Sequence, residues 1–274
     1  MNEFGWRWIS ASVAGTSHSG TGNGCQDNHF CGLLHSEQGT ILFAVVSDGA
    51  GSASRSAQGS QLLCDVLLAQ ASEFFSDRGR VADLNPRMVA NWIHLFRDEV
   101  ILQAHSEGLS DREYACTVVA AVIGPQDCAF FQIGDGALVY SDASSMLYSL
   151  AFWPERGEYE NTTFFATQPN VLDQLQFTYS QIAVNEVALF SDGLQRLALD
   201  YQAKAAYQPF FRNVFAPIHR AVGNEEVSKL NAQLASYLDS PRINERTDDD
   251  KTLILATTTV DALANLSIES PNSK

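Results

Sequence analysis

The feature that most constrains this chain is a short apolar strand that stops at an acidic residue and a glycine. Residues 41–46 are all apolar, and Ser47, Asp48 and Gly49 follow them directly. An apolar run of this length between turn signals is typical of a buried strand rather than a helix. A carboxylate at the end of a rigid strand, beside a glycine carbonyl, suits a hard metal ion, because such ions bind carboxylate and backbone oxygens.

The same pattern returns further along the chain. Residues 187–193 again end in Ser-Asp-Gly, with the acid at Asp192, and residues 130–136 end in Gly-Asp-Gly, with the acid at Asp135. Near the C-terminus the acids at 248–250 precede an apolar run instead. One Asp-Gly pair is an ordinary turn signal. Because acidic strand ends recur four times in one chain, they indicate a shared site better than they indicate separate turns.

The composition is typical of a soluble, acidic protein with a sizeable core. The 274 residues are 45% hydrophobic and 18% charged, and the formal net charge is −15. This charge argues against nucleic acid or an anionic membrane as a partner. The five cysteines are odd in number and lack Cys-x-x-Cys spacing, which disfavours disulfides and zinc ligation. Because neither a signal-peptide pattern nor a membrane-spanning apolar run occurs, we expect a cytoplasmic protein.

Turn signals and periodicity divide the chain into short strands and longer helices. Apolar or alternating runs predict strands at residues 6–14, 29–34, 41–46, 115–123, 128–133, 137–141, 163–166, 177–182, 186–191 and 252–256, with 146–151 as a candidate partner of 137–141. Helical spacing predicts helices at residues 54–75, 86–107, 194–199, 204–219 and 222–238.

Local signals also set some boundaries. Asn85 is a candidate N-cap, Gly108 ends the helix that Asn85 begins, and Pro217 marks the end of a helix or a kink. Helices early and late with strands between them predict an α+β domain with a β-sandwich centre. We expect a single domain over residues 1–260 and a disordered tail over 261–274.

The acidic motifs define a chemistry if their side chains converge. Carboxylates of Asp27, Asp48, Asp135, Asp192 and Asp249 could share one small site only with cations, because close like charges raise one another's pKa. All-oxygen ligation favours Mg²⁺ or Mn²⁺ over Zn²⁺, since these motifs contain neither His nor a suitable Cys pair. Two such ions about 3.5–4 Å apart form a clamp used in phosphate-ester hydrolysis, in which they activate a bridging water. The sequence shows no motif for a protein nucleophile.

The order of the motifs resembles the metal-dependent serine/threonine protein phosphatases of type 2C, the PPM family, and within it a bacterial branch. The likeness extends from residue 10 to about residue 258. The motifs that carry it are Gly15-Thr16-Ser17-His18, Cys25-Gln26-Asp27, residues 47–52, Cys116-Thr117, Ile133-Gly134-Asp135, Ser191-Asp192-Gly193 and residues 248–253. The resemblance implies a four-layer αββα sandwich, in which two antiparallel sheets are flanked by helices and the metals lie at one end of the sheets.

The resemblance also implies roles for individual residues. Asp48 would bridge both metals, and the carbonyl of Gly49 would bind one of them. Asp192 and Asp249 would hold the other metal. Asp249 is the motif match within the acidic triplet 248–250, although sequence alone leaves its two neighbours open as ligands.

Other positions match the family less directly. Asp27 would act largely through metal-bound water, Asp135 matches the position of a third, weaker metal, and Thr117 matches a small hydroxyl with a structural role. Many family members carry a phosphate-binding arginine shortly before the Gln-Asp pair, where this chain has Gly22. His18 is the candidate replacement, as a phosphate contact or general acid, and an ordinary solvated histidine is the competing interpretation.

The predicted function is that of a metal-dependent protein serine/threonine phosphatase, which hydrolyses phosphoserine and phosphothreonine by attack of a metal-bridging water. The expected partner is a phosphorylated protein, such as a Ser/Thr kinase or its target, with no nucleic acid and no membrane. The missing arginine leaves open a catalytically weak member that acts as a regulatory phosphoprotein-binding module. A two-metal phosphatase of a small phosphorylated metabolite is the other alternative. Arg55 is a further candidate for facing the substrate, with an ordinary surface arginine as the default interpretation. Residues 155–160 are interpreted as a solvated loop, with a flap over the site as the alternative.

Overall fold

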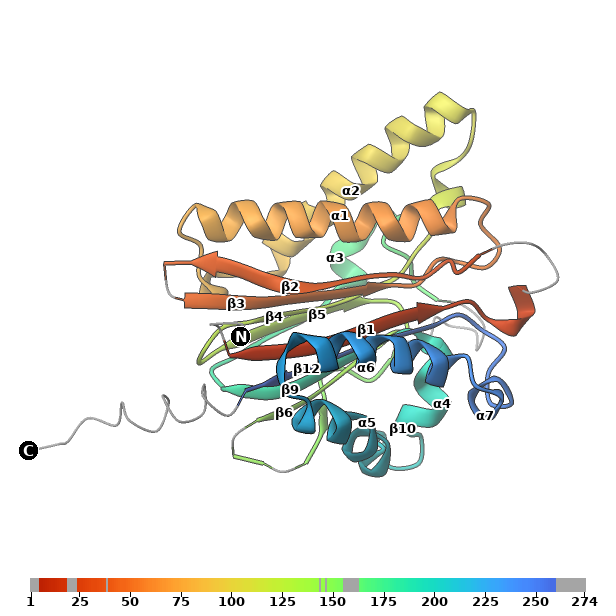
Figure 1. The fold of residues 1–274 in the computed structure, drawn as a ribbon. Coiled ribbons are helices and arrows are strands. Elements are labelled where there is room, and N and C mark those ends of the chain that lie inside the picture. Colours follow the sequence, from red (N-terminus) through yellow and green to blue (C-terminus); the bar gives the residue numbers. More distant parts are fainter. Residues whose placement is uncertain are drawn as a thin grey trace, which may run out of the picture.

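The computed structural model describes residues 5–18, 24–37, 39–142, 144–145, 147–154 and 163–259. Within these residues, two five-stranded sheets lie face to face, and helices cover the outer face of each (Figure 1). All pairs of neighbouring strands are antiparallel. The predicted αββα sandwich is therefore confirmed.

The first sheet, which we call sheet I, joins the two ends of the chain. Its order is β1 (Trp6–Val13), β12 (Lys251–Thr258), β9 (Val184–Phe190), β6 (Ala137–Asp142) and β7 (Ser149–Leu150). Its outer face carries α5 (Gln208–Arg220) and α6 (Gly223–Leu238). The short elements α4 (Gln195–Ala198), β10 (Leu199–Asp200), β11 (Ala205–Ala206) and α7 (Pro241–Asn244) complete this half.

The second sheet, sheet II, is built mainly from the first half of the chain. Its order is β2 (Asn28–Ser36), β3 (Gly39–Ser47), β4 (Val118–Ile123), β5 (Cys128–Ile133) and β8 (Gln176–Ser180). Its outer face carries α1 (Ser56–Ser76), α2 (Pro86–Glu107) and the short α3 (Val171–Gln174). Short 3-10 turns lie at Thr16–His18, Val81–Asp83, Asp111–Tyr114 and Asp192–Leu194.

The strand β3 shows why its sequence is apolar throughout. Successive side chains of a strand point to opposite faces. In β3, Phe43 and Val45 pack into the core beneath α1 and α2, whereas Ala44 and Val46 pack into the core between the two sheets. A strand with both faces buried cannot alternate with polar residues, and this explains the continuous apolar run.

The predicted helix boundaries are confirmed where a local signal sets them. The side chain of Asn85 accepts a hydrogen bond from the backbone N–H of Met88, and Gly108 adopts a left-handed conformation with φ of 70° after the last turn of α2. Pro217 does not end α5, which continues to Arg220. Because Pro217 lies in the last turns, its missing N–H removes little of the helical hydrogen bonding.

One predicted strand is wrong. Residues 163–166 form no strand, and α3 begins shortly after them. The N–H of Ala166 donates to the carbonyl of Cys116, which precedes β4, and Phe164 packs against the core beneath α1. The apolar side chains that suggested a strand therefore serve to anchor a crossing segment.

Some predictions fall on residues outside those the structure describes. These are the loop and flap at 155–160, the glycine at position 22 and the tail at 261–274. Among the described residues, no helix combines the length and apolarity that crossing a membrane requires.

Candidate functional site

The acidic motifs meet because of the strand directions. Asp48 directly follows β3, and Asp27 directly precedes β2, its antiparallel neighbour. In sheet I, Asp192 follows β9, and Asp249 precedes β12, which again is the antiparallel neighbour. Asp135 follows β5, which runs parallel to β3 two strands away. All five acids therefore lie at the same end of the two sheets.

These carboxyl groups act on one another's pKa. Loss of solvent on burial, reinforced by the charges of Asp27, Asp192 and Asp249, raises the pKa of Asp48 well above its ordinary range. Burial also raises the pKa of Asp192 to about 7, with further contributions from Asp135 and Asp249. Burial raises the pKa of Asp27 to about 7 as well. Mutual repulsion of this kind marks a site that gains from positive charge.

The unpaired oxygens of the site fit a divalent cation. Within the described residues, both carboxylate oxygens of Asp27 and Oδ1 of Asp192 are buried without a hydrogen-bond partner. Buried carboxylates are costly unless they are paired or bind a metal. In the same part of the chain, no group of three or more His, Cys, Asp or Glu side chains is placed so that it could hold a metal ion by itself. Hydrated Mg²⁺ needs only one or two carboxylates, so this donor set fits such an ion.

Gly49 lies where no larger residue would fit. A Cβ at this position would lie 2.6 Å from the carbonyl oxygen of Gln26 and 2.9 Å from the backbone carbon of Ser56. The backbone after Asp48 is therefore pressed against the segment that carries Asp27. This close approach explains why glycine follows the acid here.

The three acids at 248–250 have different roles in the structure. Asp250 is buried, and its Oδ1 accepts hydrogen bonds from the N–H of Gly15 at 2.6 Å and from Nδ1 of His18 at 2.9 Å. Its Oδ2 accepts from the N–H of Gln26 at 2.6 Å. These bonds occupy both oxygens and tie the start of β12 to two distant loops. Asp250 is therefore a structural residue.

The other two acids of the triplet differ in what they present. Asp248 contributes its backbone carbonyl, which accepts from the N–H and the hydroxyl of Ser17 at 3.0 and 2.7 Å. Asp249 is the member whose carboxyl interacts with those of Asp48 and Asp192. Desolvation raises the pKa of Asp249, as expected for a group at the rim of the acidic cluster.

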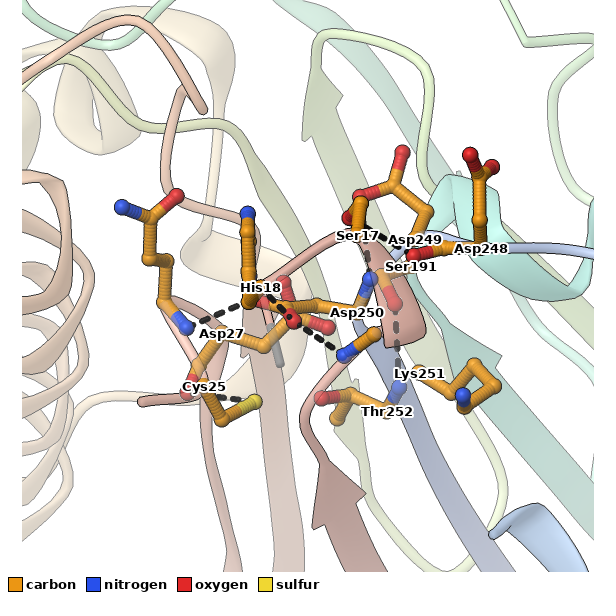
Figure 2. Close-up of polar contacts among 12 residues, drawn as sticks. Ser17, His18, Cys25, Asp27, Ser191, Asp248, Asp249, Asp250, Lys251 and Thr252 are labelled. Carbon is orange, nitrogen blue, oxygen red and sulfur yellow. Dashed lines mark hydrogen bonds and ion pairs between the residues drawn. The ribbon is translucent and has the colours of Figure 1, made fainter. Parts of the chain in front are cut away.

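His18 lies beside this cluster, as Figure 2 shows. Its side chain is 15% exposed, and Nδ1 is paired with Asp250. Desolvation raises the pKa of Asp249, and the charge of His18 opposes part of that rise. The bond to Asp250 fixes the orientation of the imidazole ring at the edge of the site.

Two further motif residues hold parts of the site in place. Thr117 accepts a hydrogen bond from the N–H of Asp48 through Oγ1 at 3.1 Å, and its own N–H donates to the Asp48 carbonyl at 2.8 Å. Asp135 accepts from the hydroxyl of Thr163 at 2.7 Å, and its carbonyl accepts from the side chain of Gln195. Asp48 is therefore clamped on both sides of its Cα.

Sequence reasoning took an ordinary surface arginine as the default for Arg55, and it missed two other arginines. Arg55 is paired with Glu107, at 2.8 Å between Nε and Oε2. A pocket of about 390 Å³ opens beside Asp192 and Asp249. Its other lining residues are Gly193, Gln195, Arg196, Tyr201 and residues 244–248, including Arg246. These residues come from separate segments, so no single motif announced the pocket.

Comparison with known proteins agrees with this geometry. The family model for protein phosphatase 2C matches residues 14–239. Serine/threonine-protein phosphatase 3 of Escherichia coli (strain K12) is 34% identical over 252 residues, which cover 92% of this chain and 98% of that protein.

Solved structures share the fold at lower identity. Serine/threonine phosphatase Stp1 from Staphylococcus aureus has a TM-score of 0.60 and 15% identity, and the match covers 94% of this chain and 97% of that one. The catalytic domain of the serine threonine protein phosphatase PstP, solved in complex with two manganese ions, has a TM-score of 0.58 and 14% identity. That match covers 93% of this chain and 99% of the PstP chain.

Proposed function

Because this chain belongs to the protein phosphatase 2C family, we propose that the acids at its sheet ends form the metal centre of the enzyme. The protein is a metal-dependent serine/threonine protein phosphatase, and its substrates are phosphoproteins. The observation that supports the placement of the centre is the set of buried, unpaired carboxylate oxygens of Asp27 and Asp192 beside Asp48.

The ligand set is the one that the family motifs imply. Asp48, whose pKa is raised in part by the charges of acids from both sheets, would be the ligand shared by two cations, and the Gly49 carbonyl would bind one of them. Asp192 and Asp249 would hold the second cation from sheet I. Asp27 would act through bound water. When bound, such cations polarise a phosphoryl oxygen and lower the pKa of water.

The chain's own residues prepare the site for that chemistry. Thr117 holds the backbone of Asp48 through two hydrogen bonds, so the carboxylate stays at the meeting point of the sheets. Asp250 fixes the start of β12 and with it Asp249. His18, oriented by Asp250, contacts the phosphoryl group or donates a proton to the leaving oxygen. These contacts reduce the reorganisation that the reaction needs.

We assign two ions of Mn²⁺ or Mg²⁺ to the centre, and a third, weaker ion to Asp135. The oxygen-only donor set supports hard cations, and the related PstP domain binds two manganese ions. The protein partner is a Ser/Thr kinase or its target. Residues 1–260 act as one domain, and the five cysteines, all free, agree with a cytoplasmic location.

The direct test is hydrolysis of a phosphoserine peptide and of p-nitrophenyl phosphate with Mn²⁺, Mg²⁺ or a chelator. We expect metal-dependent turnover that Asp48→Asn lowers at least about 100-fold, since even outer-shell changes at metal sites cost about 10–100-fold. The control is Asp98→Asn, which changes an exposed acid on α2 and should behave as wild type.

The alternatives predict different results. A regulatory binding module would bind the phosphopeptide but turn over neither substrate with any metal. A phosphatase of small metabolites would prefer phosphorylated sugars or nucleotides to every phosphopeptide. Turnover that survives in Asp48→Asn would contradict the proposed centre.

A further inference from the structure

The pocket beside the acidic cluster is a built feature of the fold. Its volume of about 390 Å³ falls within the range of about 300–1,000 Å³ that is usual for ligand sites. Asp192 and Asp249 form part of its wall, so a molecule in the pocket would touch the proposed metal centre. The remaining wall comes from α4, from the turn after β10 and from the segment that follows α7.

Two hydrogen bonds anchor the wall formed by α4 and the following turn. The hydroxyl of Tyr201 donates to Oε1 of Gln195 at 2.6 Å, and the amide nitrogen of Gln195 donates to the carbonyl of Asp135. Gln195 is itself buried. This wall therefore keeps a fixed position relative to the acidic cluster.

The opposite wall is anchored by a buried lysine. Lys251 is fully buried, and its Nζ donates to Oδ1 of Asn244 at 2.8 Å. The amide of Asn244 also donates to the carbonyl of Asp239 at 3.0 Å. A lysine ammonium carries formal positive charge. The pocket wall at Asn244 therefore has a cation directly behind it.

Two arginines line the pocket on these two walls. Arg196 lies in α4, and Arg246 follows α7. Both are exposed, and among the described residues neither guanidinium forms a hydrogen bond or an ion pair. Both guanidinium groups are therefore available to a ligand, although Glu245 and Asp248 line the same pocket.

The balance of charge in the pocket favours an anion once the metals are bound. Cations on Asp192 and Asp249 remove the negative charge of that wall. Glu245 and Asp248 then face two guanidinium groups with the ammonium of Lys251 behind them. Arginine binds carboxylate and phosphate groups in a bidentate manner, which makes these groups its preferred partners.

We propose that Arg196 and Arg246 bind an anionic group of the substrate protein beside the phosphorylated residue, and so determine specificity. This inference rests on the proposed function, because it places the phosphorylated residue at the metal centre. The anionic group is the carboxylate of an Asp or Glu side chain or a second phosphoryl group. The enzyme therefore prefers phosphorylated sites in acidic or multiply phosphorylated segments.

The test compares kcat/KM for phosphoserine peptides of equal length. One peptide has neutral flanks, two have acidic residues on the N-terminal or the C-terminal side, and one carries a second phosphoserine. We expect wild type to favour an anionic peptide by about tenfold, a modest ratio because exposed pairs are screened. In R196Q/R246Q this ratio should fall towards one, mainly through KM, since the arginines bind a group that does not react.

The matched control is Arg87→Gln, in the first turn of α2 on the other helical layer. It should keep the wild-type preference. Raising the salt concentration should shrink the preference of wild type more than that of R196Q/R246Q. The peptide with the larger ratio tells whether a carboxylate or a second phosphoryl group is the natural ligand.

A binding assay keeps this inference separable from the proposed function. The dissociation constants of the same peptides, made with a non-hydrolysable phosphonate, are measured by fluorescence anisotropy in the presence of Mn²⁺. A preference that R196Q/R246Q abolishes supports the proposal even if p-nitrophenyl phosphate is not turned over, a result that would count against the proposed function alone. Equal binding of neutral and anionic peptides by wild type overturns it. An equal loss on all peptides also overturns it, because the arginines would then bind the transferred phosphoryl group.

Discussion

Asp27 shows at the scale of one residue what the acidic site costs the fold. Its carboxylate oxygens are buried and, in the described part of the chain, unpaired, and burial raises the pKa of Asp27 to about 7. Asp192 has the same shift with the same leading cause. The folded, metal-free protein therefore holds protons on groups that are ionised in the unfolded chain.

This protonation predicts how stability depends on pH without metal. Between about pH 4 and pH 7, the folded protein binds more protons than the unfolded chain, so the free energy of unfolding falls as pH rises. With a chelator present, we expect it to fall by about 1–3 kcal/mol from pH 5 to pH 8. Urea unfolding at both pH values measures this. Asp27→Asn should flatten the slope, and a rise in stability with pH would contradict the shift.

Gly49 supports a second prediction at this scale. Gly49→Ala would place a Cβ within 2.6 Å of the carbonyl oxygen of Gln26. Overpacking of this kind costs about 1–3 kcal/mol, and the displaced carbonyl should also weaken metal binding. Urea unfolding and titration with Mn²⁺ measure the two effects. Gly24→Ala is the control, because nothing lies within 4 Å of its Cβ; equal losses in both variants would argue against the close approach at Gly49.

At the scale of elements, one carboxylate joins three segments that are far apart in sequence. Asp250 connects the start of β12 to Gly15, which follows β1, and to Gln26, which precedes β2. These bonds link sheet I to the edge strand of sheet II at the end that carries the acidic cluster. The geometry of Asp249 depends on them, because Asp249 is the next residue in the chain.

Asp250→Ala tests this connection. The change removes charge-assisted hydrogen bonds and leaves buried N–H groups without partners, at a cost of about 3 kcal/mol. We expect a lower urea midpoint and weaker Mn²⁺ binding. Asp248→Ala is the matched control, since Asp248 uses its backbone carbonyl and should lose less than about 0.5 kcal/mol. Similar midpoints for the two variants would show that Asp250 has no structural role.

At the scale of the whole molecule, the proposed cations lie between the two sheets. Asp48 belongs to the end of sheet II, and Asp192 and Asp249 belong to the end of sheet I. In the sandwich, an apolar core joins the sheets along most of their length. At this end, acids replace that core, so the sheets repel each other unless cations neutralise them.

Metal binding should therefore stabilise the whole fold. At about 100 times its dissociation constant, Mn²⁺ should raise the free energy of unfolding by about 2.7 kcal/mol. Asp48→Asn should lose most of this gain, whereas Asp98→Asn on α2 should keep it. Thermal unfolding with and without Mn²⁺ measures the difference. A gain that is the same in both variants would place the cation elsewhere.

The sequence by itself determined those features of this protein that depend only on residues close together in the chain, such as strands and helix ends. The apolar run before Asp48 defined a buried strand, and Asn85 and Gly108 marked the limits of α2, because strand burial and helix caps act over a few residues. The acidic motifs contain only oxygen ligands, and this local composition indicated hard cations. The αββα fold itself was predicted through the family resemblance, which the order of the motifs carried.

Only the tertiary structure decided what depends on contacts across the fold. It placed both oxygens of Asp250 in hydrogen bonds, which left Asp249 to face the other acids, and it paired Arg55 with Glu107. It also brought Arg196 and Arg246 to one pocket. The sequence around an Asp or an Arg does not show which partner its side chain will find in the fold. The role of each is set by segments that lie far away in the sequence and meet only when the two sheets pack together.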